Sequence, residues 1–157
     1  MKKSDFLKKL KEEGKLKLVE PSNTLKQAYL DKSSSYLESA KILFKNEKLE
    51  EAISLIYYSM YYSLLALLFR VGIKSENHTA SILLLKNLFK LDTSKILKAR
   101  KERIDKQYYV DFEIAKKDVH EMVGLAERFN AMIYDYLEKL TFEKIEEIRK
   151  KFTKLLK

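Results

Sequence analysis

The hydrophobic positions of the chain recur mainly at steps of three and four residues, which is the period of an amphipathic helix. The first long stripe follows Ser22 and Asn23, either of which can cap a helix with its side-chain oxygen. The apolar positions of this stripe are Leu25, Ala28, Tyr29, Tyr36, Ala40, Leu43 and Phe44. Because they line one face only, the pattern predicts a helix that packs one side against a core.

The next segment, residues 52–69, contains no charged residue. A run of this length reaches the lower limit for a membrane span. However, three serines and four tyrosines are spread around all of its faces, and Glu51 and Arg70 bound it directly. We therefore expect the central helix of a bundle that ends at Gly72, and no membrane as a partner.

Three more helices are expected after residues that can cap them, namely Asn77, then Thr93 or Ser94, then Asp111. The helix from Asp111 is expected to be the longest, because a near-heptad stripe of apolar residues continues as far as Leu140. Such a stripe needs another helix to cover it.

The two ends of the chain carry shorter helical patterns. One covers Ser4–Glu13 and ends at Gly14, and Pro21 interrupts the stretch that follows. The last helix begins at Thr141 and is apolar on one side, which favours packing on its own bundle over binding a partner protein.

No segment shows the alternation of a strand, so the sequence predicts an all-α fold. The core is expected to be an antiparallel up-and-down helical bundle of four to five helices over residues 22–140. A short N-terminal helical appendage (1–21) and a C-terminal amphipathic helix (141–157) extend it.

Composition supports a single helical domain. The chain has 157 residues, 46% of them hydrophobic, with only three glycines and one proline, too few turn residues for a β-sandwich or barrel. It has no cysteine, which excludes disulfides, thiolate nucleophiles and Cys-ligated metal sites. No signal-peptide pattern opens the chain, so we expect it in the cytoplasm.

The charge balance favours polyanionic partners such as RNA or DNA. The chain has 32 basic and 23 acidic residues, a net charge of +9. Residues 86–106 hold eight basic and three acidic residues, so this stretch carries +5. Two alternatives stay open: a solvated helix face, and the Lys- and Glu-rich composition that is also typical of hyperthermophile proteins.

The usual catalytic signatures are absent. Gly14, Gly72 and Gly124 lie too far apart for a phosphate-binding loop. His78 and His120 are the two histidines, and neither stands in a metal-binding motif. The hydroxyl nucleophiles have no evident partner base. We therefore predict no metal and no cofactor.

Four short segments point to a specific family. In chain order they are Leu10–Leu16, the tyrosine-rich run Ile56–Tyr61, Asn77–Ala80 at the start of a helix, and Arg103–Tyr108. Each matches a motif of the HEPN family, in the same order. Over residues 5–138 the chain therefore resembles HEPN domains.

This resemblance implies a small helical domain of a kind often encoded beside a minimal nucleotidyltransferase and often present as a homodimer. Many HEPN proteins are metal-independent RNases in which an arginine is followed four to six residues later by a histidine. Arg103 matches the arginine, while Tyr108 and Tyr109 stand where the histidine is expected.

The catalytic candidates are therefore Arg103, Tyr108 and Tyr109. A phosphodiester that is being cleaved needs a cation at its developing negative charge and a group that moves protons. Tyrosine, with a pKa of about 10, is a poor base at neutral pH but can act as an acid. The candidates for binding RNA or a nucleotide are Lys98, Lys101, Lys106, His78 and Tyr58.

Helical geometry constrains this catalytic pair. On an unbroken helix Arg103 and Tyr108 lie about 140° apart and cannot share one phosphate. A shared site needs either fraying of the helix near Gln107 or a second subunit that completes it. The family resemblance favours the second subunit.

The sequence thus predicts a HEPN-type subunit of a toxin–antitoxin-like or defence pair that binds RNA and, in a stronger form of the hypothesis, cleaves it without metal. Its expected partners are a second copy of the chain, a minimal nucleotidyltransferase antitoxin, and RNA or a nucleotide. The alternative is a non-catalytic subunit that binds a nucleotide or the nucleotidyltransferase, which could modify the tyrosines. A basic protein on anionic membranes is a third interpretation, but the tyrosine-rich run does not support it.

Overall fold

The computed structural model describes residues 2–108 and 115–157, with the backbone alone for residues 106–108. Helices make up most of this part of the chain. In order, the elements are α1 (Lys3–Glu12), β1 (Leu16–Leu18), α2 (Asn23–Lys45), α3 (Leu49–Val71), β2 (Ile73–Ser75), α4 (His78–Phe89), α5 (Ser94–Tyr108), α6 (Lys116–Lys139) and α7 (Phe142–Leu155). The predicted all-α class is confirmed.

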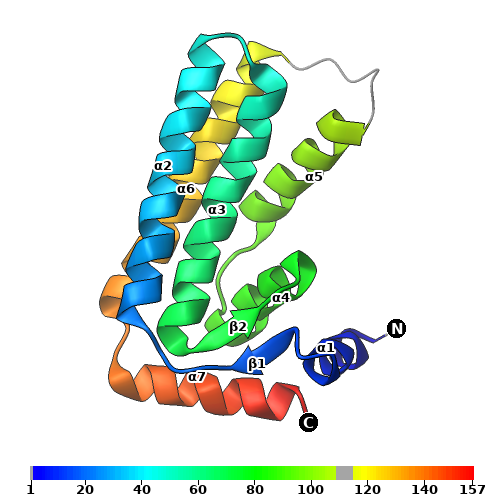
Figure 1. The fold of residues 1–157 in the computed structure, drawn as a ribbon, viewed down its shortest axis with the longest axis vertical. Coiled ribbons are helices and arrows are strands. Elements are labelled where there is room, and N and C mark those ends of the chain that lie inside the picture. Colours follow the sequence, from blue (N-terminus) through cyan, green and yellow to red (C-terminus); the bar gives the residue numbers. More distant parts are fainter. Residues whose placement is uncertain (1, 109–114) are drawn as a thin grey trace.

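The long helices α2, α3 and α6 lie side by side, with α5 leaning against α3 (Figure 1). Helix α3 is central and packs on α2, α5 and α6. The shorter elements α1, β1, β2, α4 and α7 gather at the end of the bundle where α3 finishes. This arrangement brings the middle of α3, the start of α4 and the second half of α5 to one junction.

Helix α3 is the uncharged segment of the sequence, and it is buried rather than exposed to lipid. It is long and apolar enough to cross a membrane, but 72% of its most apolar window is covered by the rest of the fold. Its buried serines bond to neighbouring helices: Ser59 Oγ donates to the Ser33 carbonyl (2.8 Å), and Ser63 Oγ donates to Asn130 Oδ1 (2.8 Å). These bonds satisfy the polar groups that a membrane span would have to avoid.

The structure contains two short strands, although the sequence pattern predicted none. β1 pairs antiparallel with β2, in the register Leu16 to Ser75 and Leu18 to Ile73. The turn into β2 is made by Gly72, whose φ of 78° is left-handed. A Cβ at this position would collide with the Val19 carbonyl oxygen, so only glycine fits there.

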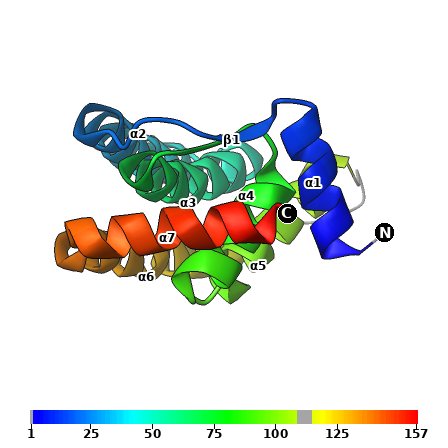
Figure 2. The same cartoon turned by 90° about the horizontal axis from the view of Figure 1, so that it is seen from below.

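Both ends of the chain pack on the common core. Helix α1 buries Leu7 and Leu10, and α7 crosses beneath the bundle (Figure 2) while burying Ile145, Ile148 and Phe152. The expectation that the last helix packs on its own bundle is therefore confirmed. The terminal helices and residues 22–140 share one hydrophobic core.

Local capping signals placed most helix starts correctly. Ser22 Oγ accepts from the Leu25 N–H, and Asn77 Oδ1 accepts from the Ala80 N–H. Helix α6 is the longest described helix, as predicted, but it begins at Lys116 with Ala115 at the N-cap position instead of following Asp111. Asp111 itself lies outside the described residues.

Candidate functional site

Three of the predicted site residues meet at the junction of α3, α4 and α5. Tyr58 lies in the middle of α3, His78 is the first residue of α4, and Arg103 lies in the second half of α5. Arg103 Nη2 donates to the Tyr58 hydroxyl at 3.0 Å. We call this group, with the neighbouring side chains of Tyr57 and Arg100, the junction cluster.

Stacked rings hold the histidine of the junction cluster in place. The asparagine cap at Asn77 fixes the start of α4, so the His78 ring projects onto α3. There it stacks on the Tyr61 ring, with centroids 3.8 Å apart and planes 12° from parallel. The Tyr57 hydroxyl lies 2.8 Å from His78 Nδ1. Tyr57 and Tyr61 lie on one face of α3 because they are four residues apart.

The guanidinium of Arg103 lies over aromatic rings. Its Cζ is 4.9 Å from the Tyr58 ring centroid and 5.6 Å from that of Tyr57, within the range of a cation–π interaction. Its Nε–H is buried and has no hydrogen-bond partner among the described residues. The arginine is therefore oriented by tyrosines, with donor capacity left over.

A second arginine lies close by. Arg100, one helical turn before Arg103 on α5, donates from Nη1 to Thr79 Oγ1 at 2.9 Å. All ion pairs found in the described part of the chain use lysines, so neither arginine is paired there with a carboxylate. The junction cluster thus concentrates positive charge without an internal anion.

This positive charge and burial set the protonation of His78. Burial, followed by the charges of Arg100 and Arg103, lowers the pKa of His78 below its usual 6.5, so the imidazole is neutral at pH 7. Burial also raises the pKa of Tyr57 well above 10, so its phenol keeps its proton. The Tyr57 hydroxyl donates to Nδ1 when the imidazole proton is on Nε2, and accepts from Nδ1 in the other tautomer. His78 is therefore a neutral imidazole with one N–H.

The predicted lysines do not join the junction cluster. Lys98 and Lys101 are exposed. At 100° per residue they lie about 140° and 160° around α5 from Arg103. They line the solvent side of the helix.

Three further predictions fall at the end of α5 or beyond it. The side chains of Lys106 and Tyr108, and all of Tyr109, lie outside the described residues. The α5 backbone is helical through Gln107 to Tyr108, so the structure does not show the fraying that a shared site within one subunit would need.

The donor set of the junction cluster suits an oxyanion. Guanidinium groups bind phosphate oxygens with paired N–H bonds, and an imidazole N–H adds a third donor. Among the described residues, no group of three or more His, Cys, Asp or Glu side chains could hold a metal ion. Sequence reasoning missed the roles of Tyr57, Tyr61, Thr79 and Arg100. The spacing of the two arginines on one face of α5 was the signal that could have found Arg100.

A family model for the HEPN domain matches residues 26–140, which run from α2 to the end of α6 and include the junction cluster. The chain belongs to the HEPN domain family. Membership places this HEPN chain among proteins with nucleotide- or RNA-related functions.

One curated relative shares part of this HEPN chain. A UPF0332 protein of Thermotoga maritima is 42% identical to it over 43 residues, which is 27% of this chain and 33% of the relative. The match therefore spans a third of that relative's length. Helices α1 and α7 and strand β1 lie outside the family match but pack on the same core.

Proposed function

We propose that this HEPN chain binds RNA by holding a backbone phosphate between Arg100 and Arg103, with the His78 N–H as a third donor. The observation that carries the proposal is the position of Arg103. Its guanidinium is fixed on Tyr57 and Tyr58, one helical turn from Arg100, and neither arginine is paired with a carboxylate among the described residues. Two neighbouring guanidinium groups without a carboxylate partner favour an anion with several oxygens.

The electrostatics of the site favour an incoming anion. Two guanidinium groups close together repel each other, and their field makes protonation of His78 unfavourable. A phosphate between them would remove this repulsion and add charge-assisted hydrogen bonds. Binding of an anion should therefore raise the pKa of His78, which links occupancy of the site to a measurable titration.

The overall charge of the chain supports RNA over a small anion. The net charge of +9 attracts a polyanion at long range. Lys98 and Lys101 contribute to this attraction from the solvent side of α5, away from the junction cluster. We expect these two lysines to speed the first encounter between the protein and RNA, while the arginines determine where the phosphate binds.

Cleavage is a separate part of the proposal. Because the Tyr57 hydroxyl occupies Nδ1, and burial and the two arginines lower the pKa of His78, the imidazole is a weak base for proton abstraction. Metal-independent cleavage would therefore depend on Tyr108 or Tyr109, completed by a second copy of the chain. A homodimer and a minimal nucleotidyltransferase partner remain predictions that rest on the family resemblance.

Fluorescence anisotropy with a labelled single-stranded RNA tests the binding site. Arg103→Gln is expected to weaken binding by about tenfold and to lower the salt dependence by about one phosphate contact. Arg100→Gln should act in the same direction. Arg70→Gln is the matched control, because Arg70 is also a half-buried arginine but lies about 18 Å further along α3 from Tyr58.

A titration of His78 provides a second readout. The NMR signals of the imidazole should titrate at higher pH when inorganic phosphate is added to the wild type, and this effect should disappear in Arg103→Gln. If both arginine variants bind RNA as tightly as Arg70→Gln, the phosphate site is not at the junction cluster. Circular dichroism of each variant checks that the fold is intact.

A further inference from the structure

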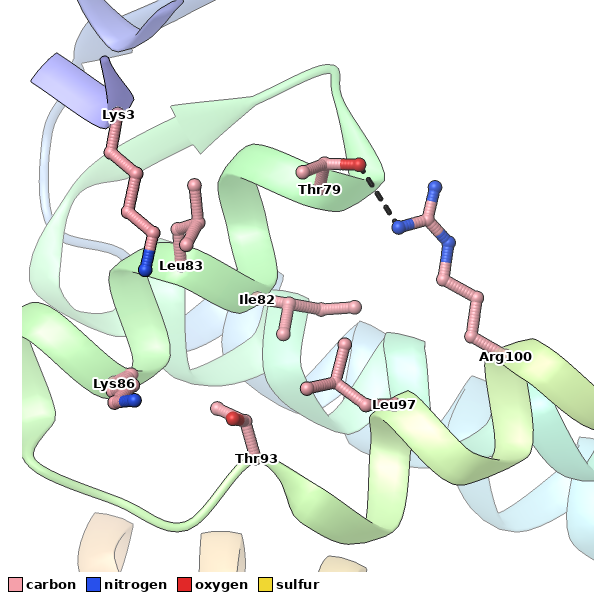
Figure 3. Close-up of a pocket in the computed structure, with 8 residues that line it drawn as sticks. All are labelled: Lys3, Thr79, Ile82, Leu83, Lys86, Thr93, Leu97 and Arg100. Carbon is pink, nitrogen blue, oxygen red and sulfur yellow. Dashed lines mark hydrogen bonds between the residues drawn. The ribbon is translucent and has the colours of Figure 1, made fainter. Parts of the chain in front are cut away.

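A small pocket opens beside the hydrogen bond between Arg100 and Thr79 (Figure 3). Its volume is about 140 Å³. Ile82 and Leu83 of α4 and Leu97 of α5 form its apolar walls. This pocket is separate from the Tyr57–His78 pair, but Arg100 belongs to both places.

The rim of the pocket is cationic. Lys3 reaches towards it from α1, Lys86 lies on α4, and Arg100 closes the side next to Thr79 (Figure 3). Within the described residues, none of these three cations is paired with a carboxylate. The pocket therefore combines an apolar interior with unneutralised positive charge at its edge.

One wall is also left open to solvent. Leu97 is 47% exposed, whereas Ile82 opposite it on α4 is 4% exposed. Lys98, the next residue on α5, is also exposed, as expected for a charged residue on the solvent side of a helix. Leu97 is instead an exposed apolar residue at the mouth of the pocket. Covering this side chain with a flat apolar ligand would be favourable, because it removes apolar surface from water.

We propose that this pocket receives one unpaired base of an RNA strand whose adjacent phosphate is held by Arg100 and Arg103. A nucleotide unit joins a flat base, with apolar faces and polar edges, to an anionic phosphate, which matches an apolar pocket that shares a cation with a phosphate site. The pocket volume of about 140 Å³ is about ten times the ~10–15 Å³ that one water molecule needs on the same measure, so a flat ring can enter.

This inference rests on the proposed function and narrows its substrate class to single-stranded RNA. A base can enter a side pocket only after it leaves its stack and loses its pairing partner. Single strands offer such bases, whereas the bases of a duplex are paired and stacked. The Thr93 side chain, which also lines the pocket, supplies a hydroxyl for an edge of the base.

The test compares two probes that differ only in their bases. One is a labelled adenylate hexamer, and the other is a hexamer of abasic nucleotides with the same phosphates. Wild-type protein is expected to bind the adenylate hexamer about tenfold more tightly, in line with the contribution of one accommodated base. A Leu97→Gln variant should reduce this ratio to threefold or less and leave the affinity for the abasic hexamer unchanged.

Leu25→Gln is the matched control, because Leu25 is a leucine on α2 with 41% exposure and should leave the ratio at the wild-type value. Equal binding of the two hexamers by the wild type would overturn the base pocket while leaving the phosphate site standing. If Leu97→Gln still prefers the adenylate hexamer as strongly as the wild type does, the base pocket is also overturned, because the base would then bind elsewhere. If neither hexamer binds, the proposed function itself fails.

Discussion

Arg149 is expected to hold the C-terminal helix against the end of the central helix. Its Nη1 lies 2.8 Å from the Val19 carbonyl oxygen, 3.1 Å from that of Val71 and 3.0 Å from that of Gly72. Helix α3 ends at Val71, so this carbonyl has no partner within the helix. The positive charge of Arg149 also compensates the partial negative charge at the C-terminal end of α3.

The hydrogen bonds of Arg149 set how much stability Arg149→Gln should lose. Nη1 carries two hydrogens, so the three carbonyls share the equivalent of two charge-assisted bonds. Each such bond contributes about 1.5–3 kcal/mol, and the half-buried position favours the lower part of this range. We expect the free energy of unfolding to fall by about 3–4 kcal/mol. For a domain of this size, the melting temperature should drop by about 6–16 °C.

Urea and thermal unfolding followed by circular dichroism would measure this change. Lys150→Gln is the control, because Lys150 is an exposed cation on the same helix and should change stability by less than about 0.5 kcal/mol. Arg149→Lys should recover part of the loss, since it keeps the charge but not the planar fork. RNA affinity should be unchanged under native conditions. An Arg149→Gln protein as stable as the Lys150→Gln control would refute the reasoning.

Three further predictions concern the junction cluster and its surroundings. Because the pKa of His78 is lowered on folding, the unfolded chain binds a proton that the native state resists. The free energy of unfolding should therefore fall as pH drops below about 6.5. In urea titrations at pH 5–8, His78→Gln should reduce this dependence on pH, and an unchanged dependence would contradict the prediction. Replacing Lys98 and Lys101 together by glutamine should reduce the salt dependence of RNA binding, and unaltered affinity at low salt would show that this is only a solvated face. Tyr108→His should raise the rate of RNA cleavage in the presence of EDTA by about 10²-fold. If the same increase is measured when Arg103 is also replaced, the catalytic site lies elsewhere.

Much of the helical architecture follows from local sequence. Helix periodicity and side-chain caps act over three to four residues, so the starts at Ser22 and Asn77 could be predicted correctly. The uncharged run of α3 also indicated the central helix. The strands could not be predicted in the same way. Each has three residues, too few to show alternation, and their pairing joins segments more than fifty residues apart.

The sequence by itself determined an all-helical chain, the family motifs and the residue types of the candidate site. Which of those residues act together was decided by the tertiary structure. Arg100 and Lys101 are neighbours in sequence and equal in charge, yet only Arg100 faces the junction cluster, because α5 turns one side towards α3 and α4. His78 meets Arg103 through the tyrosines of α3 for the same reason: contacts between helices depend on how their faces pack, and no short-range pattern records that choice.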